Sequence, residues 1–402
     1  MGSINKLSVD DIDVKGKKVR VRCDFNVPLV NGEISDDTRI KAALPTIQKL
    51  LKGGAKLILC SHIGKTKDKK TIEPVAKRLS VLLSKNVKFK HSENVVDDEI
   101  RAMADKLNNG DILLLENTRL RDEEEKCGED FSKELASLSD GIFVDDAFGT
   151  AHRAHSSNVG VTKYIDCCAS GYLMQKEIDK LVNAVETPVR PFIAILGGAK
   201  VSDKLKVIDK LLDKCDKLII GGGMSYTFLK AMGKNVGNSL VDEEKISYCQ
   251  DMIDKAQRLG KSLILPIDCV AAKEFPNPIN NKKAEAKNFS FEDLPNDYMA
   301  LDIGVESIKL FMKELKGSKT VIWNGPMGVF ENEKYAVGTY CIARFLSDMK
   351  DATTIIGGGD SASAVTKFNL ANKMTHVSTG GGATLEYLEG IELPGILSLT
   401  DK

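Results

Sequence analysis

Four apolar, strand-like runs in the second half of the chain each end in a glycine cluster that opens into a helix-like segment. These passages are Phe192–Lys200, Leu218–Phe228, Thr354–Val365 and His376–Leu388. Glycines leave room for backbone N–H groups and a helix N-terminus to approach an anion closely. The repeated pattern therefore predicts phosphate-binding turns.

The strand-like runs of the first half end in side chains of a different kind. In chain order they are Val19–Val27 with Asp24 and Asn26, Leu57–Lys65 with His62, Ile112–Leu120 with Arg119, and Ile142–Arg153 with His152 and Arg153. Ligands of open α/β sheets bind outside the carboxyl ends of the strands. We therefore expect the two halves to present different surfaces to different ligands.

The chain is long enough for two domains with cores of their own. It has 402 residues, of which 42% are hydrophobic, and domains of about 150–200 residues bury most of their apolar surface. Lys plus Arg and Asp plus Glu both total 57, so the overall charge favours neither a nucleic-acid nor a membrane partner. The composition favours a small-molecule partner.

Targeting and cysteine patterns indicate a cytoplasmic protein. No apolar run approaches the roughly 20 residues of a membrane span, and the polar start MGSINKLSVDD lacks the apolar region of a signal peptide. The nine cysteines include no CxxC pair and no zinc-ligand spacing. We expect them to be reduced and mostly buried.

Short apolar runs alternate with segments of helical period along the whole chain. Such alternation is typical of the α/β class and predicts two Rossmann-like domains, each a mainly parallel sheet flanked by helices. The stretch Pro276–Pro295, rich in Asn, Lys and Pro, is interpreted as a surface excursion inside the second domain.

The domain boundary is expected near Gly171–Pro191. A predicted helix, Tyr172–Glu186, is followed by Pro188 and Pro191, which cannot continue it. This helix would connect the domains as part of a hinge. The predicted division is 1–171 for the first domain, 172–191 for the helix and linker, and 192–392 for the second domain.

None of the glycine turns fits a standard nucleotide motif. Gly221–Gly223 lacks the third glycine of GxGxxG, and neither GGAK at 197–200 nor GGGD at 357–360 fits GxxxxGK[ST]. A single turn of this kind is as readily explained by tight packing as by a ligand. The phosphate-binding prediction therefore depends on four such turns occurring in one domain.

Charged residues beside these turns suggest roles toward a nucleotide. Lys200 and Lys204 are four residues apart, so we expect both on one face of the helix that begins beside Gly198, where they hold the outer phosphates. Asp360 is placed to hold magnesium while Ser361 caps the helix. The plainer alternatives are a solvated lysine pair and a capping role for Asp360.

Other polar residues suit a ribose or a second anion. Trp323-Asn324-Gly325-Pro326, with Glu331, is interpreted as a hydrogen-bonding loop after a strand. Arg39, Arg119 and Arg153 each carry a planar fork suited to carboxylate or phosphate, although any one of them is more often a surface ion-pair partner. His62 and Asn26 would add directed contacts.

Taken together, these motifs are similar to those of the phosphoglycerate kinase family. The resemblance covers essentially the whole chain and is nearest to the compact bacterial form. The matching stretches, in the family's order, are RVRCDFNVPL, DDTRI, LCSHIGK, LLLENTR, VDDAFGTAHRAHSS, ILGGAKVSDK, GGGMSYTF, WNGPMGVFE, GGGDSASAV and STGGGATLEYLEG.

The resemblance implies a role for each matching residue. The 3-phosphoglycerate or 1,3-bisphosphoglycerate site would comprise Asp24, Asn26, Arg39, His62, Lys65, Arg119 and Arg153. The ADP or ATP site would comprise Gly198, Ala199, Lys200, Lys204, Gly222, Gly223, Gly304, Asn324, Pro326, Val329, Glu331, Asp360 and Ser361. The transferring group would meet Arg39, Lys200, Gly358, Gly359, Gly381 and Gly382, and Asp360 would bind Mg²⁺.

The resemblance also implies a monomer whose C-terminal tail, 393–402, returns to the first domain. One departure concerns Lys65, which stands where the family usually has arginine and which binds as a point charge. The implied reaction needs no general base, because both nucleophiles are ionised at neutral pH. A dehydrogenase with an unusual dinucleotide site and a nucleotide-dependent scaffold without catalysis remain the alternatives.

Overall fold

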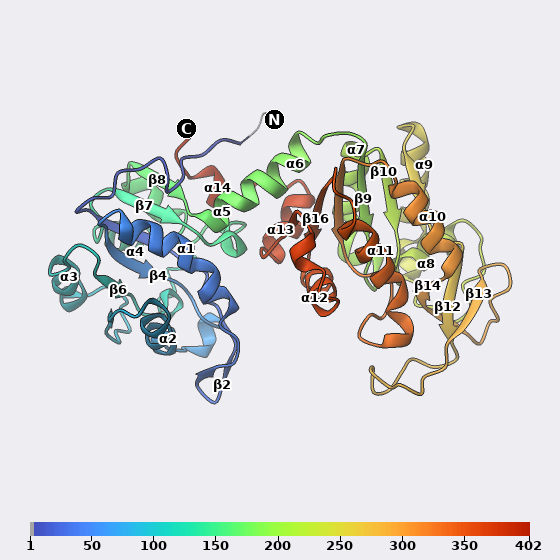
Figure 1. Cartoon of the computed structure of the whole chain (residues 1–402), viewed down its shortest axis with the longest axis horizontal. Helices are drawn as coiled ribbons and strands as arrows, with labels where there is room; N and C mark the ends of the chain where they lie inside the picture. Colours follow the sequence, from blue (N-terminus) through green and yellow to red (C-terminus); the bar gives the residue numbers. More distant parts are fainter. Residues whose placement is uncertain (1–3) are drawn as a thin grey trace. The chain divides into compact units, whose positions relative to one another are not determined.

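The computed structural model describes residues 4–402, which divide into two compact units (Figure 1). We call residues 4–179 together with Glu392–Lys402 the N-terminal unit, and Lys180–Ile391 the C-terminal unit. Each unit contains a six-stranded parallel sheet flanked by helices. The α/β class predicted from the sequence is confirmed.

The sheet of the N-terminal unit has the order β5-β6-β4-β1-β7-β8. The strands are β1 (Lys18–Arg22), β4 (Lys56–Cys60), β5 (Val87–Phe89), β6 (Ile112–Leu114), β7 (Ile142–Asp145) and β8 (Cys167–Ser170). The main helices are α1 (Thr38–Lys52), α2 (Glu73–Leu83), α3 (Asp98–Asp105) and α4 (Glu129–Ala136), and a short hairpin joins β2 (Leu29–Val30) to β3 (Glu33–Ile34).

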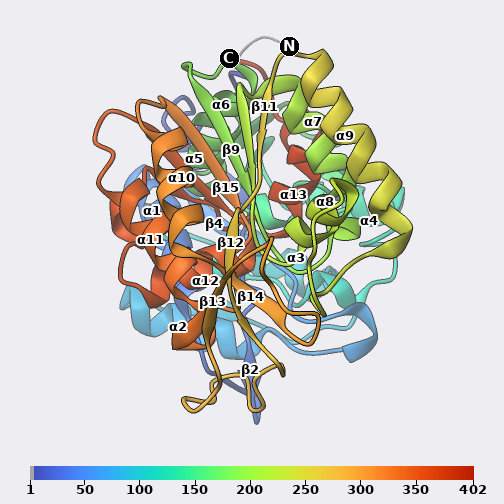
Figure 2. The same ribbon diagram turned by 90° about the vertical axis from the view of Figure 1, so that its right-hand side faces the viewer.

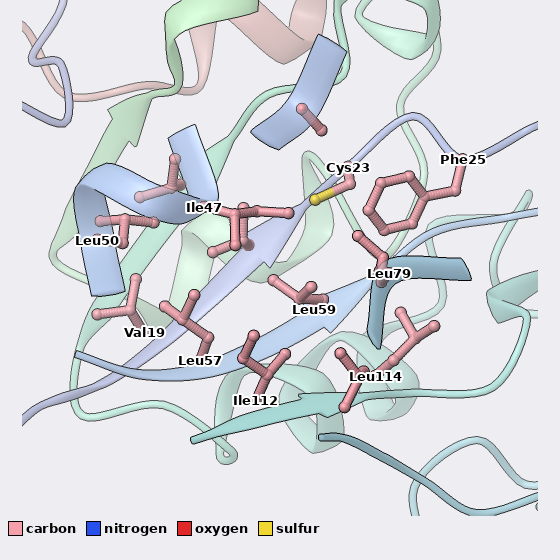
Figure 3. Close-up of a cluster of buried hydrophobic side chains, with 14 of the residues drawn as sticks. Val19, Cys23, Phe25, Ile47, Leu50, Leu57, Leu59, Leu79, Ile112 and Leu114 are labelled. Atoms are coloured by element: carbon pink, nitrogen blue, oxygen red, sulfur yellow. The ribbon is translucent and has the colours of Figure 1, made fainter. Parts of the chain in front are cut away.

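Helices α1 and α2 cover one face of this sheet. Figure 3 shows Ile47 and Leu50 of α1 and Leu79 of α2 among apolar side chains of the strands, and these three residues are fully or almost fully buried. The strand side chains in this cluster include Val19, Leu57, Leu59, Ile112 and Leu114. Helices cover both faces of such a sheet, so most of its strand residues are apolar, but β1 carries the buried arginines Arg20 and Arg22.

The sheet of the C-terminal unit has the order β11-β10-β9-β15-β16-β17. Its strands are β9 (Phe192–Leu196), β10 (Lys217–Ile220), β11 (Ser262–Ile264), β15 (Thr320–Asn324), β16 (Thr353–Gly357) and β17 (His376–Val377). Its helices are α7 (Leu205–Lys214), α8 (Met224–Ala231), α9 (Ile246–Arg258), α10 (Val305–Leu315), α11 (Val337–Ser347), α12 (Gly359–Lys367) and α13 (Gly382–Leu388). In Figure 2, α10 and α11 lie on one side of the strands, and α7 and α9 lie on the other.

A small antiparallel sheet adds to the C-terminal unit. Its order is β13-β12-β14, with β12 at Asp268–Ala272, β13 at Lys287–Ser290 and β14 at Met299–Ile303. The stretch interpreted as a surface excursion, Pro276–Pro295, contains β13. The sequence reasoning missed this strand because half of it is exposed and its residues, KNFS, carry no apolar alternation.

The helix expected over Tyr172–Glu186 is present in three consecutive parts. They are α5 (Tyr172–Glu177), a π-helical turn (Ile178–Val182) and α6 (Asn183–Glu186). Asp146 Oδ1 accepts a hydrogen bond from the backbone N–H of Leu173 at 2.8 Å, which holds the start of α5 in the N-terminal unit. The division between the units falls between Asp179 and Lys180, inside the π-helical turn.

The C-terminal tail belongs to the N-terminal unit. The Thr400 carbonyl accepts a hydrogen bond from Leu7 N–H at 2.9 Å, and Thr400 N–H donates to the Cys168 carbonyl at 2.9 Å. The short helix α14 (Pro394–Leu397) precedes these contacts. None of the helices in residues 4–402 combines the length and apolar character that crossing a membrane requires.

Candidate active site

The glycine turns follow strands β9, β10, β16 and β17 of the C-terminal sheet, and Asn324 ends β15 just before the loop with Pro326. The chain runs from β9 to β10 on one side and later returns to β15 on the other, so strand order reverses at β9. Open α/β sheets bind ligands outside the carboxyl ends of the strands at such a point. The topology therefore gathers these turns at one edge of the sheet.

Backbone hydrogen bonds join three of these turns. Gly198 N–H donates to the Pro326 carbonyl at 3.1 Å, and Gly222 N–H donates to the Met327 carbonyl at 3.1 Å. A Cβ on Gly222 would lie 2.7 Å from the backbone nitrogen of Gly198, and Gly222 has a φ of 65°. Glycine is therefore required by close approach of backbone, and neither of these N–H groups is left for a phosphate.

Other backbone N–H groups of the same turns have no partner in the protein. Within residues 4–402, the N–H groups of Ala199, Lys200, Gly223, Gly358 and Gly381 donate no hydrogen bond. The N–H groups of Gly359 at the start of α12 and of Gly382 at the start of α13 add to them, whereas Ala383 N–H already donates to the Gly380 carbonyl at 3.0 Å. These N–H groups, rather than those of Gly198 and Gly222, can donate hydrogen bonds to an anion.

Lys200 and Lys204 do not share a helix face, so that prediction was wrong. Lys200 has extended backbone, a 3₁₀ helix spans Val201–Lys204, and α7 begins only at Leu205. Lys204 Nζ donates to the Gly197 carbonyl at 2.6 Å and to the Asn324 carbonyl at 2.9 Å. Burial lowers the pKa of Lys204 to about 8. Lys200 is exposed and has no ion-pair partner in residues 4–402.

Ser361 does not cap α12, which corrects a second prediction. The helix has Gly358 at its N-cap and no side-chain capping bond. The buried Ser361 hydroxyl instead accepts a hydrogen bond from Gly325 N–H at 2.5 Å, which ties α12 to the turn after β15. Asp360 lies exposed in the first helical turn.

Asn324 supplies the clearest sign of a missing partner. The residue is 3% exposed, and its side-chain Nδ2 is fully enclosed without a hydrogen-bond partner. A Cβ built on Gly358 would lie 3.1 Å from this nitrogen, so the amide faces the β16 turn. An orphaned buried donor costs free energy unless a ligand or water accepts from it.

The remaining nucleotide-site candidates occupy the loop after β15 and the start of α10. Pro326 is buried, Val329 N–H donates to the Leu301 carbonyl at 2.9 Å, and Glu331 is exposed. A Cβ on Gly304 would meet the Asp268 carboxylate at 2.3 Å, so packing alone explains this glycine. A cavity of about 490 Å³ opens beside Ala199 and Lys200 and is also lined by Ser202, Thr227 and residues 240–245.

No group of three or more His, Cys, Asp or Glu side chains in residues 4–402 is arranged to hold a metal ion. A magnesium ion that is bound through substrate phosphates needs only one or two protein carboxylates. Asp360 is exposed and forms no ion pair within 4 Å in the described chain. It therefore suits this role without a preformed cage.

In the N-terminal unit the predicted residues lie after β1, β4, β6 and β7. Arg39, near the start of α1, forms an ion pair with Asp24. Asn26 Oδ1 accepts a hydrogen bond from Gly64 N–H at 3.0 Å, and Arg119 Nη1 donates to the Gly64 carbonyl at 2.7 Å. These two contacts fix the loop that follows β4 and carries His62.

Cations and histidines lie close together at this edge of the sheet. Burial and the charges of Arg22, Arg119 and Arg153 hold the pKa of His62 well below its ordinary value. The same causes lower the pKa of His155 to about 3. The structure therefore brings these arginines and histidines together and keeps both imidazoles neutral.

Arg153 and Lys65 are exposed in the same region. Arg153 Nε donates to Nε2 of His152 at 3.1 Å. The Lys65 backbone N–H donates to Asp68 at 3.1 Å, while its ammonium group forms no ion pair in residues 4–402. Both cations can therefore turn toward an anion without breaking an ion pair.

Comparisons with known proteins agree with this geometry. A family model described as phosphoglycerate kinase matches residues 9–391. The chain is 57% identical over 402 residues to phosphoglycerate kinase of Clostridium botulinum (strain Hall), covering 99% of both chains. It is 56% identical over 409 residues to that of Clostridioides difficile (strain 630), with 100% coverage of both.

The chain belongs to the phosphoglycerate kinase family. It is therefore a kinase, a transferase of glycolysis whose acceptor is a carboxyl group. The solved structure of phosphoglycerate kinase from Coxiella burnetii superimposes with a TM-score of 0.90 at 37% identity, and that from Pyrococcus horikoshii with 0.81 at 31%; each comparison covers 98% of both chains.

Sequence reasoning missed two buried residues that contact the candidate site of the N-terminal unit. Arg22 is 1% exposed and contacts His62, and Glu124 is fully buried and accepts from the Ser157 hydroxyl at 2.5 Å. The available signal was the alternation of Arg20 and Arg22 with valines inside an apolar strand. Charges at such positions are rarely buried without a partner.

The lowered pKa of Lys204 predicts a pH-dependent stability of the C-terminal unit. Between about pH 8 and the ordinary lysine value of 10.5, the unfolded chain holds more protons than the folded one, so stability from this group rises with pH. Relative to Lys204→Met, the wild-type free energy of unfolding should rise over this window, by at most about 3 kcal/mol. Urea unfolding followed by fluorescence of Trp323, the only tryptophan, measures this.

The control is Lys206→Met, which removes an exposed lysine two residues away. It should change stability by nearly the same amount at every pH. A wild-type minus Lys204→Met difference that stays flat across the window would show that Lys204 titrates as an ordinary lysine.

Proposed function

We propose that the chain transfers a phosphoryl group reversibly from 1,3-bisphosphoglycerate to ADP, giving 3-phosphoglycerate and ATP. The observation that carries the proposal is the pairing of two complementary anion sites in one chain. One is the arginine and histidine cluster of the N-terminal unit, and the other is the set of unpartnered N–H groups after β9, β10, β16 and β17. Family membership supports the same reaction.

The phosphoglycerate site is assigned to the predicted first domain, 1–171 with the tail 393–402, which forms most of the N-terminal unit. Arg119 and Arg153 supply charge, and His62 and Asn26 supply directed contacts. Asp24 holds Arg39 in place through their ion pair. Lys65 adds a point charge, because an ammonium group cannot form the bidentate contact of the arginine usual in the family.

The nucleotide site is assigned to residues 192–392. The free N–H groups of Ala199, Lys200, Gly223 and Gly358 donate hydrogen bonds to phosphate oxygens. Asn324 Nδ2 also donates a hydrogen bond to the nucleotide. The cavity beside Lys200 includes the apolar residues Leu240 and Val241, which suit a planar base. Gly198, Gly222 and Lys204 act by shaping the turns rather than by direct donation.

The transfer step depends on positioning and on charge stabilisation. A carboxylate and a terminal phosphate are already ionised, so no residue has to remove a proton. Lys200, Arg39 and the N–H groups of Gly358, Gly359, Gly381 and Gly382 stabilise the charge on the transferring group. Asp360 holds Mg²⁺, which neutralises phosphate charge when bound.

The connecting helix is proposed as a hinge for domain closure in a cytoplasmic monomer. Asp146 holds the start of α5 in one unit, and Glu186, at the end of α6, pairs with Lys214 at 2.8 Å in the other. The π-helical turn lies between these anchors, and such turns are frequent at functional positions. The tail provides a second chain connection.

A coupled assay for ATP formation from 1,3-bisphosphoglycerate and ADP tests the function. The wild-type chain should be active, and Arg39→Ala should lower turnover by about 10²–10³, roughly 2.7–4 kcal/mol, if Arg39 acts like a preorganised donor. Lys41→Ala, an exposed cation on the same helix, is the control. An inactive wild type refutes the function, and a raised KM with normal turnover limits Arg39 to ground-state binding.

Asp360→Asn tests the metal assignment. The substitution should weaken use of the magnesium nucleotide, because it removes the carboxylate charge while preserving size. Binding of 3-phosphoglycerate, measured by calorimetry on the whole chain, should be nearly unchanged. Asp351→Asn, an exposed residue before β16, is the control. An equal loss for both ligands would refute either the metal assignment or the division of the two sites.

Small-angle scattering tests closure. The radius of gyration should fall when both ligands are bound and change little with either one alone, because neither unit contains both sets of binding groups. Full compaction by the nucleotide alone, or none with both ligands, would refute the hinge. The kinase assignment would stand in either case.

A further inference from the structure

His62 is in contact with a buried arginine that fixes which ring nitrogen carries its proton. Arg22 Nη2 lies 2.9 Å from His62 Nδ1, and the two residues are 1% and 5% exposed. A guanidinium group has five N–H donors, has no acceptor and remains charged in proteins. The contact is therefore a hydrogen bond only if Nδ1 accepts.

The ring has one proton to place, because it is neutral. Burial and the charges of Arg22 and Arg119 hold the pKa of His62 well below its ordinary value, so the imidazolium form is disfavoured near neutral pH. With Nδ1 accepting, the single proton belongs on Nε2. No hydrogen bond within residues 4–402 involves Nε2, and this atom is not among the enclosed polar atoms without a partner.

We propose that Arg22 is a positioning residue that holds His62 in the tautomer protonated at Nε2, so that the ring presents an N–H donor to the acid substrate. This inference rests on the proposed function for the identity of that substrate. It assigns Arg22 a role through His62 rather than direct contact with the substrate.

A chain of directed hydrogen bonds holds Arg22 itself. Its Nε donates to the Ser157 hydroxyl at 2.8 Å, and that hydroxyl donates to Glu124 Oε1 at 2.5 Å. Glu124 Oε2 accepts from Ser157 N–H at 3.0 Å. Because the guanidinium group can only donate, the hydrogen bonds run outward from Arg22, to Ser157 and Glu124 on one side and to His62 Nδ1 on the other.

The opposite ring orientation is disfavoured by the same burial. Turning the imidazole over would place a C–H group against Arg22 and leave a buried cationic donor without an acceptor. Arg20, two residues earlier on β1, provides a natural comparison. It is fully buried and contacts Cys60 Sγ at 3.4 Å and the Ser157 carbonyl, but not His62.

The tautomer is measured by NMR of the full chain labelled with ¹⁵N-histidine, with His62→Gln used to identify the His62 signals. We expect an unprotonated Nδ1 and a protonated Nε2 throughout the range of about pH 6–8 in which a free histidine titrates. A proton on Nδ1, or a doubly protonated ring in this range, would overturn the inference. This measurement needs no change to Arg22.

Arg22→Met then tests the cause. The variant should show both tautomers and a KM for 3-phosphoglycerate raised roughly tenfold or more, as for loss of a hydrogen bond to a charged group. The KM for the magnesium nucleotide should stay within about twofold. Arg22→Lys should restore part of the preference for the Nε2–H tautomer and part of the affinity for 3-phosphoglycerate. Arg20→Met should keep the Nε2–H tautomer. An Arg22→Met protein with unchanged tautomer and unchanged KM would contradict the proposal.

The same variants separate this inference from the proposed function. If His62→Gln leaves the KM for 3-phosphoglycerate unchanged while the wild type shows the Nε2–H tautomer, the assigned role of His62 toward the substrate is wrong. If His62→Gln raises that KM but the wild type carries its proton on Nδ1, the role of Arg22 is wrong and the function stands.

Discussion

The hydrogen bonds that join the turns after β9, β10 and β15 are the constraint on which the candidate site of the C-terminal unit depends. Pro326 and Met327 accept from Gly198 and Gly222, and Lys204 donates to two carbonyls of the same turns. These contacts use donors that a phosphate would otherwise attract. They also fix the positions of the neighbouring N–H groups, so the donors left over are held before any ligand arrives.

In the N-terminal unit, buried charged side chains rather than backbone hydrogen bonds hold the groups of the candidate site in position. Arg20 and Arg22 are buried in β1, where they alternate with valines and where an ion without partners costs several kcal/mol or more. Buried carboxyl groups nearby include Glu124 and Asp145. Burial raises the pKa of Asp145 to about 6 although both arginines act to lower it. The polar network is therefore part of the core, and it orients the side chains at the edge of the sheet.

Sequence reasoning identified the elements well because they depend on local pattern. The predicted segments around Asp24, His62 and Asp360 all follow strands. In a strand–helix unit, the polar residues that follow the strand lie at the carboxyl end of the sheet. It failed where tertiary hydrogen bonds decide the outcome. Spacing placed Lys200 and Lys204 on one helix, whereas a 3₁₀ turn precedes α7. Composition could not reveal that Ser361 bonds to Gly325, or that Arg22 is buried against His62.

The arginine-rich surroundings of His62 and His155 also determine how this candidate site responds to pH. Histidine usually changes charge near neutrality, but here burial and neighbouring cations hold the pKa of both rings well below that range. The positive charge close to these two rings then comes from guanidinium groups, which do not titrate. A neutral imidazole ring offers a directed hydrogen bond but no charge. Because neither ring gains a proton near neutral pH, the two histidines do not change the charge of the cluster across physiological pH.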